Sequence, residues 1–245
     1  MILRQELLNP ADFVEDHPLF INGEQVGKTQ ERAVGWHASE LVKGAATQAG
    51  LMEEYEGEFA WNWDMLLGLG VEAFFIRKKG ITSVGGTIWQ IGEMAIPTGL
   101  TGKSKDGRSL CTVYANTDGY SPEVEWAGGK ASGKGQVSKH VGRVVPVLEE
   151  FKSTEKSLAK DPAKHFYWHM QMKTYLKAKQ LKFGSAHRWA RLWCLWLCGD
   201  YGKDWGGPVI IGKKKVMTCW WIEYTQAEID NNWWVLMEWL KGQRA

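Results

Sequence analysis

The chain has 245 residues, of which 44% are hydrophobic and 24% are charged, and its net charge at pH 7 is +2. These proportions are those of a folded protein with one large domain or two small ones, and they exclude a disordered chain. No uncharged apolar run reaches the length of a membrane-spanning helix, the first residues lack the layout of a signal peptide, and the four cysteines show no disulfide-framework spacing. We therefore expect a cytoplasmic protein with reduced thiols.

The first half of the chain predicts a helix followed by strands. Ser39 can cap a helix that runs to about Tyr55, with apolar residues spaced near the helical period. Residues 81–96, 109–115 and 123–126 are rich in β-formers and are separated by Asp-Gly turn dipeptides. We expect these segments to form a small antiparallel meander packed by helices, so the predicted fold class is α+β.

The second half of the chain is predicted to be mainly helical. Residues 127–143 contain five glycines, four basic residues and no acid, which predicts a basic loop. Residues 146–198 are predicted as helices broken at Pro162 and near Gly184. A hairpin over residues 208–224 and an aromatic helix from Asp230 to Lys241 complete a Trp-rich C-terminal part, which we expect to share a domain with residues 1–205.

Charge is segregated along the sequence. Residues 1–72 hold 4 basic and 13 acidic side chains, a net charge of −9, whereas residues 152–191 hold 10 basic and 2 acidic side chains, a net charge of +8. Lys152, Lys156, Lys160 and Lys164 recur every fourth residue, so on one continuous helix they would form a single ridge. Such a ridge is either a solvated helix face, a surface for nucleic-acid phosphates, or a surface for an acidic protein.

Tryptophan is unusually abundant, with 15 residues, ten of them after residue 165. Most are expected to form a core or an oligomer interface. A few could stack on nucleobases, which contributes roughly 1–3 kcal/mol per base in single-strand binders. The candidate stacking residues are Trp126 and Trp168. The candidate phosphate contacts are Lys130, Lys134, Lys152, Lys156, Lys160, Lys164, Lys173, Lys177, Arg188 and Arg191.

No catalytic constellation emerges from the motifs, and neither a cofactor nor a metal is expected. Residues 96–104 end in Gly-Lys-Ser, but a proline replaces the first glycine of a P-loop and a strand, not a helix, follows, so we expect a basic hairpin turn. His165, His169, Cys194 and Cys198 have helical i, i+4 spacing, which fits a zinc site or apolar packing. The acids of residues 53–64 fit a solvated surface or a metal-nuclease site.

The order of these segments resembles the RecT/Redβ type of phage single-strand annealing proteins over residues 40–205. The resemblance rests on short sequences that match strands of the meander, the basic helix and the segment that closes it: 110–114, 122–126, 160–162, Met170, Lys173, Ala178, 188–191 and 199–201. It implies ATP-independent annealing of complementary strands on an oligomeric ring or filament, with Lys and Arg holding the backbone.

The function predicted from the sequence is therefore single-stranded DNA binding and annealing without covalent chemistry, by a homo-oligomer that does not bind membranes. Two alternatives remain open. One is a viral structural or assembly protein, such as a capsid or connector subunit, because opposite charges and many tryptophans also suit subunit packing. The other is a metal-dependent enzyme acting on nucleic acid, with Glu53 or Asp64 in its site.

Overall fold

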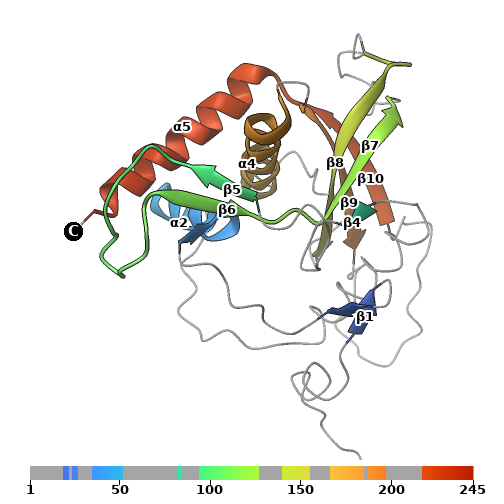
Figure 1. Cartoon of the computed structure of the whole chain (residues 1–245). Helices are drawn as coiled ribbons and strands as arrows, with labels where there is room; N and C mark the ends of the chain where they lie inside the picture. The colour runs from blue at the N-terminus through green and yellow to red at the C-terminus, as the bar shows by residue number, and fades with distance from the viewer. Residues whose placement is uncertain are drawn as a thin grey trace, which may run out of the picture.

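The computed structural model describes residues 19–21, 24–26, 35–51, 82–83, 94–126, 140–154, 166–184, 187–196 and 217–244. These form an α+β fold with three helices and three sheets in the described part, as the sequence predicts (Figure 1). The helices are α2 (Ala38–Gln48), α4 (Phe166–Phe183) and α5 (Gln226–Gly242). No helix in these segments is long and apolar enough to cross a membrane.

The largest sheet has five strands in the order β10-β9-β8-β7-β4. Their bounds are β4 (Thr82–Ser83), β7 (Gly119–Glu125), β8 (Val144–Thr154), β9 (Trp189–Trp196) and β10 (Met217–Glu223). Strands β8 and β9 are parallel and the other neighbours are antiparallel. Parallel neighbours need a crossover connection, and α4 lies between them in the chain.

Two smaller sheets complete the described strands. Strands β3 (Trp36–His37), β6 (Thr112–Ala115) and β5 (Met94–Pro97) form one, and β1 (Leu19–Ile21) pairs with β2 (Glu24–Val26) in the other. The strands that the sequence placed in one meander are thus divided, because β5 and β6 pair with each other whereas β7 pairs with β8. The turn dipeptide after β6 leads the chain from one sheet into the next instead of closing a hairpin.

Residues 146–198, which the sequence predicted as mainly helical, begin and end in strands. The apolar run that opens β8 is a buried strand: Val147 is fully buried and Leu148 is 1% exposed. Such a short apolar run cannot be assigned to helix or strand by periodicity alone. The register between β7 and β8 shifts at Ser121 and Val124, where a proline lies in each strand and no backbone N–H can be donated.

Helix α4 forms the centre of the molecule. It contacts β5 and β6 on one side, β8 on another, and both other helices (Figure 1). Its residues are buried around most of its circumference, and polar members such as Gln171 and Lys179 are buried among them. A helix with this pattern is an internal element and not an amphipathic surface helix. The side chains of α4 that face β8 are therefore held in fixed positions in the protein interior.

Candidate active site

Two acidic side chains meet where β7 begins beside β8. Gly119 pairs with Glu149 in the antiparallel register, which places Asp118 directly opposite Glu150. Directly opposed residues point to the same face of a sheet, here the face that α4 contacts. The backbone N–H of Phe151 donates to Asp118 Oδ2 at 2.9 Å and holds that carboxylate against β8.

Lys152 supplies the third charged group of this cluster. It lies two residues beyond Glu150 on the same face of β8, and its Nζ forms an ion pair with Glu150 Oε1. The Glu150 side chain is fully buried and that of Lys152 is 17% exposed. The cluster of Asp118, Glu150 and Lys152 therefore gathers two carboxylates and one ammonium group in a nearly dry place.

The charges of the cluster are unbalanced. Burial, together with the neighbouring charge of Asp118, raises the pKa of Glu150 to about 8. Burial also raises the pKa of Asp118, while the charge of Lys152 opposes this rise. Burial alone would lower the pKa of Lys152, but the charges of Glu150 and Asp118 raise it. Two acids that resist being ionised together, with a single cation between them, attract a further proton or a further cation.

Helix α4 covers the cluster with polar groups. Gln171 Nε2 donates to the hydroxyl of Tyr175 at 2.8 Å, and both residues are buried. Burial and the charges of Glu150 and Asp118 raise the pKa of Tyr175 well above its ordinary value. Burial also raises the pKa of Tyr167, a shift that the charge of Lys152 opposes and that of Glu150 supports. The sheet thus contributes the charged side chains of the site, and helix α4 contributes its neutral polar side chains.

The donor set fits a small divalent cation with oxygen ligands. Glu150 Oε2 is buried and accepts no hydrogen bond from the residues that the structure describes. A buried carboxylate oxygen without a partner is costly unless a cation or a proton takes that place. Within the described segments no group of three or more His, Cys, Asp or Glu side chains gathers as a metal cage. A pair of carboxylates is nevertheless sufficient for Mg²⁺, which keeps several of its waters.

The basic residues predicted to hold phosphates do not form one row. Lys152 lies on a strand and not on a helix, so the predicted ridge does not include it. Lys177 pairs with Asp230 at 2.7 Å, and Arg191 Nε lies 2.9 and 3.0 Å from the two carboxylate oxygens of Glu149. Lys130, Lys134, Lys156, Lys160 and Lys164 lie outside the described residues.

The two remaining basic candidates contact aromatic rings. Lys173 Nζ is 5.6 Å from the centroid of Phe166, and the Arg188 guanidinium is 5.3 Å from that of Trp189. Three of the five candidates that can be placed, Lys152, Lys177 and Arg191, thus have acidic partners within the protein. The described part therefore carries less uncompensated positive charge than the sequence suggests.

Both candidate stacking residues are buried. Trp126 is 1% exposed and packs with Trp189 and Trp221 in a second apolar cluster, on the side of the sheet away from α4. Trp168 is 8% exposed and belongs to the main core. Their rings pack in the interior, which does not favour the predicted stacking on nucleobases.

The structure describes some residues of the predicted P-loop-like, zinc and metal-nuclease motifs. Residues 103–109 form a tight turn, in which Ser104 N donates to Arg108 O at 2.9 Å, as expected from the absence of a P-loop helix. His169 Nδ1 forms a hydrogen bond of 2.6 Å with the hydroxyl of Tyr224. His165, Cys198, the Cys194 side chain and the acids of residues 53–64 lie outside the described residues.

Sequence reasoning missed Asp118 and Glu150, and it named Lys152 as a candidate phosphate contact but expected it on a helix. Asp118 was interpreted as part of a turn dipeptide and Lys152 as the start of a basic helix. The signal that could have found them is the apolar run Val144-Val145-Pro146-Val147-Leu148, which is followed by Glu149, Glu150 and, after Phe151, by Lys152. Charged residues at the end of an apolar strand have no packing role, so they are candidates for a site.

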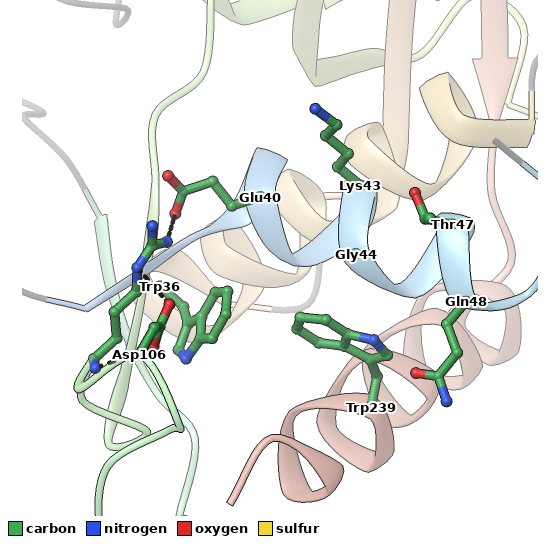
Figure 2. A pocket seen from close by; sticks show the side chains of 9 residues that line it. Trp36, Glu40, Lys43, Gly44, Thr47, Gln48, Asp106 and Trp239 are labelled. Carbon is green, nitrogen blue, oxygen red and sulfur yellow. Dashed lines mark hydrogen bonds and ion pairs between the residues drawn. The ribbon is translucent and has the colours of Figure 1, made fainter. Parts of the chain in front are cut away.

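A separate hollow lies at the other end of the helices (Figure 2). It is lined by α2, by Trp239 of α5, and by Asp106 and Arg108 of the turn between β5 and β6. Arg108 Nη1 is 2.7 Å from Glu40 Oε2, and its guanidinium lies 4.9 Å from the ring centroid of Trp36. Arg108 is thus paired with both Glu40 and Asp106 at this hollow.

No protein-family model and no curated protein matches this sequence. The solved structures similar to it include LHK-Exo in complex with dAMP, with 17% identity over 85% of this chain and 87% of that one and a TM-score of 0.43. The structure of SSO0001 has 10% identity over 93% and 82% of the two chains and a TM-score of 0.41. The alkaline exonuclease LHK-Exo from Laribacter hongkongensis has 15% identity over 86% and 90% and a TM-score of 0.34.

Proposed function

We propose that this protein is a divalent-metal-dependent phosphodiesterase that acts on nucleic acid, with its site at Asp118, Glu150 and Lys152. The observation that carries the proposal is the half-buried Asp118 carboxylate facing the fully buried Glu150 carboxylate across β7 and β8, with Glu150 Oε2 lacking a hydrogen-bond partner among the described residues. The Lys152 ammonium, bound to the same carboxylate, distinguishes this cluster from an ordinary buried acid pair.

Asp118 and Glu150 would hold the cation, and their hard oxygen atoms suit Mg²⁺ or Mn²⁺. When bound, such an ion polarises a phosphoryl oxygen and lowers the pKa of a bound water. The pKa of Glu150, raised to about 8, describes the protein without that ion. Binding of a cation would favour the ionised carboxylate, so metal uptake releases protons.

Lys152 contributes a fixed positive charge beside the carboxylates. In the protein without the ion, the charges of Glu150 and Asp118 raise its pKa against the effect of burial, which favours the ammonium form at neutral pH. A preorganised ammonium in a dry site stabilises negative charge that develops on the oxygen atoms of a phosphoryl group. This role fits hydrolysis of a phosphodiester better than chemistry on a neutral substrate.

The neutral polar side chains of α4 complete the proposed site. The Tyr175 hydroxyl, which accepts a hydrogen bond from Gln171, can donate its own proton to an anionic oxygen. Its raised pKa means that it stays a neutral donor throughout the physiological range. Together, Lys152 and Tyr175 offer donors from two elements, which suits the tetrahedral phosphate group of a nucleic-acid backbone.

The test is hydrolysis of labelled single-stranded and duplex oligonucleotides with Mg²⁺, Mn²⁺ or EDTA. The wild-type protein is expected to cleave only with metal, and Asp118→Asn and Glu150→Gln to lower kcat at least 100-fold. Lys152→Met is expected to lower kcat, while metal binding by the two carboxylates persists. Glu123→Gln, an exposed acid on the same strand β7, is the matched control and should cleave like the wild type. Activity that persists in both carboxylate variants would refute the proposal.

Strand annealing without covalent chemistry is a separate activity that the same preparations can test. Its predicted phosphate contacts are partly neutralised by Glu149, Glu150 and Asp230 in the described segments, so it is not the function we favour. Annealing of complementary oligonucleotides by the Asp118→Asn variant, in EDTA, would establish it independently of hydrolysis.

A further inference from the structure

Lys179 of α4 is buried without an acidic partner. Its side chain is completely inaccessible, and its Nζ forms no hydrogen bond with any described residue. The ammonium lies 3.9 Å from the ring centroid of Tyr120 and 5.6 Å from that of Phe183. Aromatic faces attract a cation, but they cannot accept its three N–H bonds as a carboxylate or phosphate would. A buried, unpaired ammonium group is among the least favourable features of a protein interior.

The charged neighbours of Lys179 are positive as well. Burial and the charge of Lys182 lower the pKa of Lys179 to about 8. Burial and the charge of Lys179 in turn lower the pKa of His187, whose ring is 6.0 Å from Tyr120 and 5.8 Å from Phe183. In the described part of the chain, Lys179 forms no ion pair. The surroundings of Lys179 therefore lack a negative charge that would balance its ammonium group.

Lys179 is close to the carboxylate pair. It follows Gln171 and Tyr175 at intervals of four residues, so the three side chains share one face of α4. Its partner ring, Tyr120, is two residues beyond Asp118 on the same face of β7, which corresponds to about 7 Å along an extended strand. The ammonium is thus offset along the strand from the site where we place the scissile phosphodiester.

We propose that Lys179 forms an anion subsite that receives a phosphate group of the bound strand adjacent to the scissile one. The inference rests on the proposed function. Phe183 is the last residue of α4, is 49% exposed and is followed by Gly184 at a φ of 107°, so its side chain can move aside without disturbing the core. An incoming phosphate then supplies the acceptors that the ammonium lacks.

The first test does not depend on hydrolysis. Thermal unfolding is followed in EDTA with increasing inorganic phosphate for the wild type, Lys179→Met and Lys182→Met. Lys182 is the matched control because it is exposed on the same helix end. Phosphate should stabilise the wild type and Lys182→Met, and its apparent affinity for Lys179→Met should be at least tenfold weaker. Without phosphate, Lys179→Met should unfold at a higher temperature than the wild type. Equal phosphate effects in all three proteins would overturn the proposal.

The second test separates the subsite from the catalytic centre. An oligonucleotide offers a neighbouring phosphate, whereas bis(4-nitrophenyl) phosphate contains only one. Lys179→Met should lower kcat/KM for the oligonucleotide about tenfold, chiefly through KM, and leave hydrolysis of the small diester unchanged. An equal loss on both substrates would show a purely structural role and refute the subsite. If no protein hydrolyses either substrate with metal, the proposed function fails, and the phosphate titration still decides the role of Lys179.

Discussion

Arg191 on β9 binds Glu149 on β8 through both carboxylate oxygens, at 2.9 and 3.0 Å from its Nε. Ser121 Oγ and Trp193 Nε1 also donate to this carboxylate, each at 2.8 Å, so Glu149 is fully satisfied on the sheet face opposite Glu150. Two adjacent glutamates of one strand thus have contrasting environments. Glu149 on β8 is bound by side chains of β7 and β9. Glu150 is paired with Lys152, and its Oε2 accepts no hydrogen bond from the described residues.

Removing the Arg191 side chain should therefore lower the free energy of unfolding. Arg191→Met leaves the buried Glu149 carboxylate with only the neutral donors Ser121 and Trp193, and we expect a loss of about 3–5 kcal/mol in the free energy of unfolding. Urea denaturation measures it. Arg188→Met, at a half-buried position directly before β9 with no acidic partner among the ion pairs of the described residues, is the control and should change stability by less than about 1 kcal/mol. A similar small loss for Arg191→Met would contradict the structural role given to this ion pair.

Metal binding should stabilise the folded protein. Because Asp118 and Glu150 converge only in the folded state, Mg²⁺ or Mn²⁺ at about 100 times its Kd should add about 2.7 kcal/mol to the free energy of unfolding. Differential scanning calorimetry with and without EDTA checks this. Asp118→Asn should lose the effect, while Asp106→Asn, an exposed aspartate of the turn before β6, should retain it.

Stability should depend on pH in two windows because of Lys179 and His187. The pKa of Lys179 is lowered to about 8 and that of His187 to about 4, so the unfolded chain binds more protons than the folded one between about 8 and 10.5 and between about 4 and 6.5. Stability contributed by these groups therefore rises with pH in both windows. The groups that face them are Lys182 and Tyr120.

Lys179→Met provides the check on this coupling. It should remove the rise above pH 8 and shift the His187 pKa upward towards 6.5, since one of the two causes of its depression is gone. NMR titration of the His187 ring measures that shift directly. An unchanged His187 pKa would show that the two side chains do not interact.

A methyl group at Gly44 should be poorly tolerated. A Cβ built there would lie 2.3 Å from the ring of Trp239, which packs against the helix at this point (Figure 2). We expect Gly44→Ala to lose about 1–3 kcal/mol through overpacking, despite the better helix propensity of alanine. Gly242→Ala in α5 is the control, because its Cβ would meet nothing within 4 Å, and it should be neutral or slightly stabilising. Thermal unfolding distinguishes the two.

Elements with strong local signals could be predicted from the sequence. Helix α2 has the predicted apolar spacing, but its N-cap is His37 and not Ser39, and it ends at Gln48 instead of near Tyr55. Helix α5 begins four residues before the predicted Asp230, with a capping box in which Thr225 accepts from Glu228 N. The α+β class follows from such segments. By contrast, β8 is an apolar run without alternation, and its following lysine suggested a helical ridge that the strand excludes.

The candidate site could not be predicted because its members are separated in the sequence. Asp118 and Glu150 are adjacent only through the β7–β8 register, which depends on the irregularity at Ser121 and Val124. A register shift of one residue would turn one carboxylate to the opposite face of the sheet. Lys179 was counted as one of many basic residues, and only its burial distinguishes it from a solvated lysine.

The contact between the two ends of the described chain has a consequence for biosynthesis. Trp36 and Gly44 near the beginning pack against Trp239 near the end, with the two indole rings 5.3 Å apart. A nascent polypeptide on the ribosome cannot bury the outer side of α2 until α5 has emerged. Prematurely terminated products consequently expose apolar surface, which marks them for proteolysis.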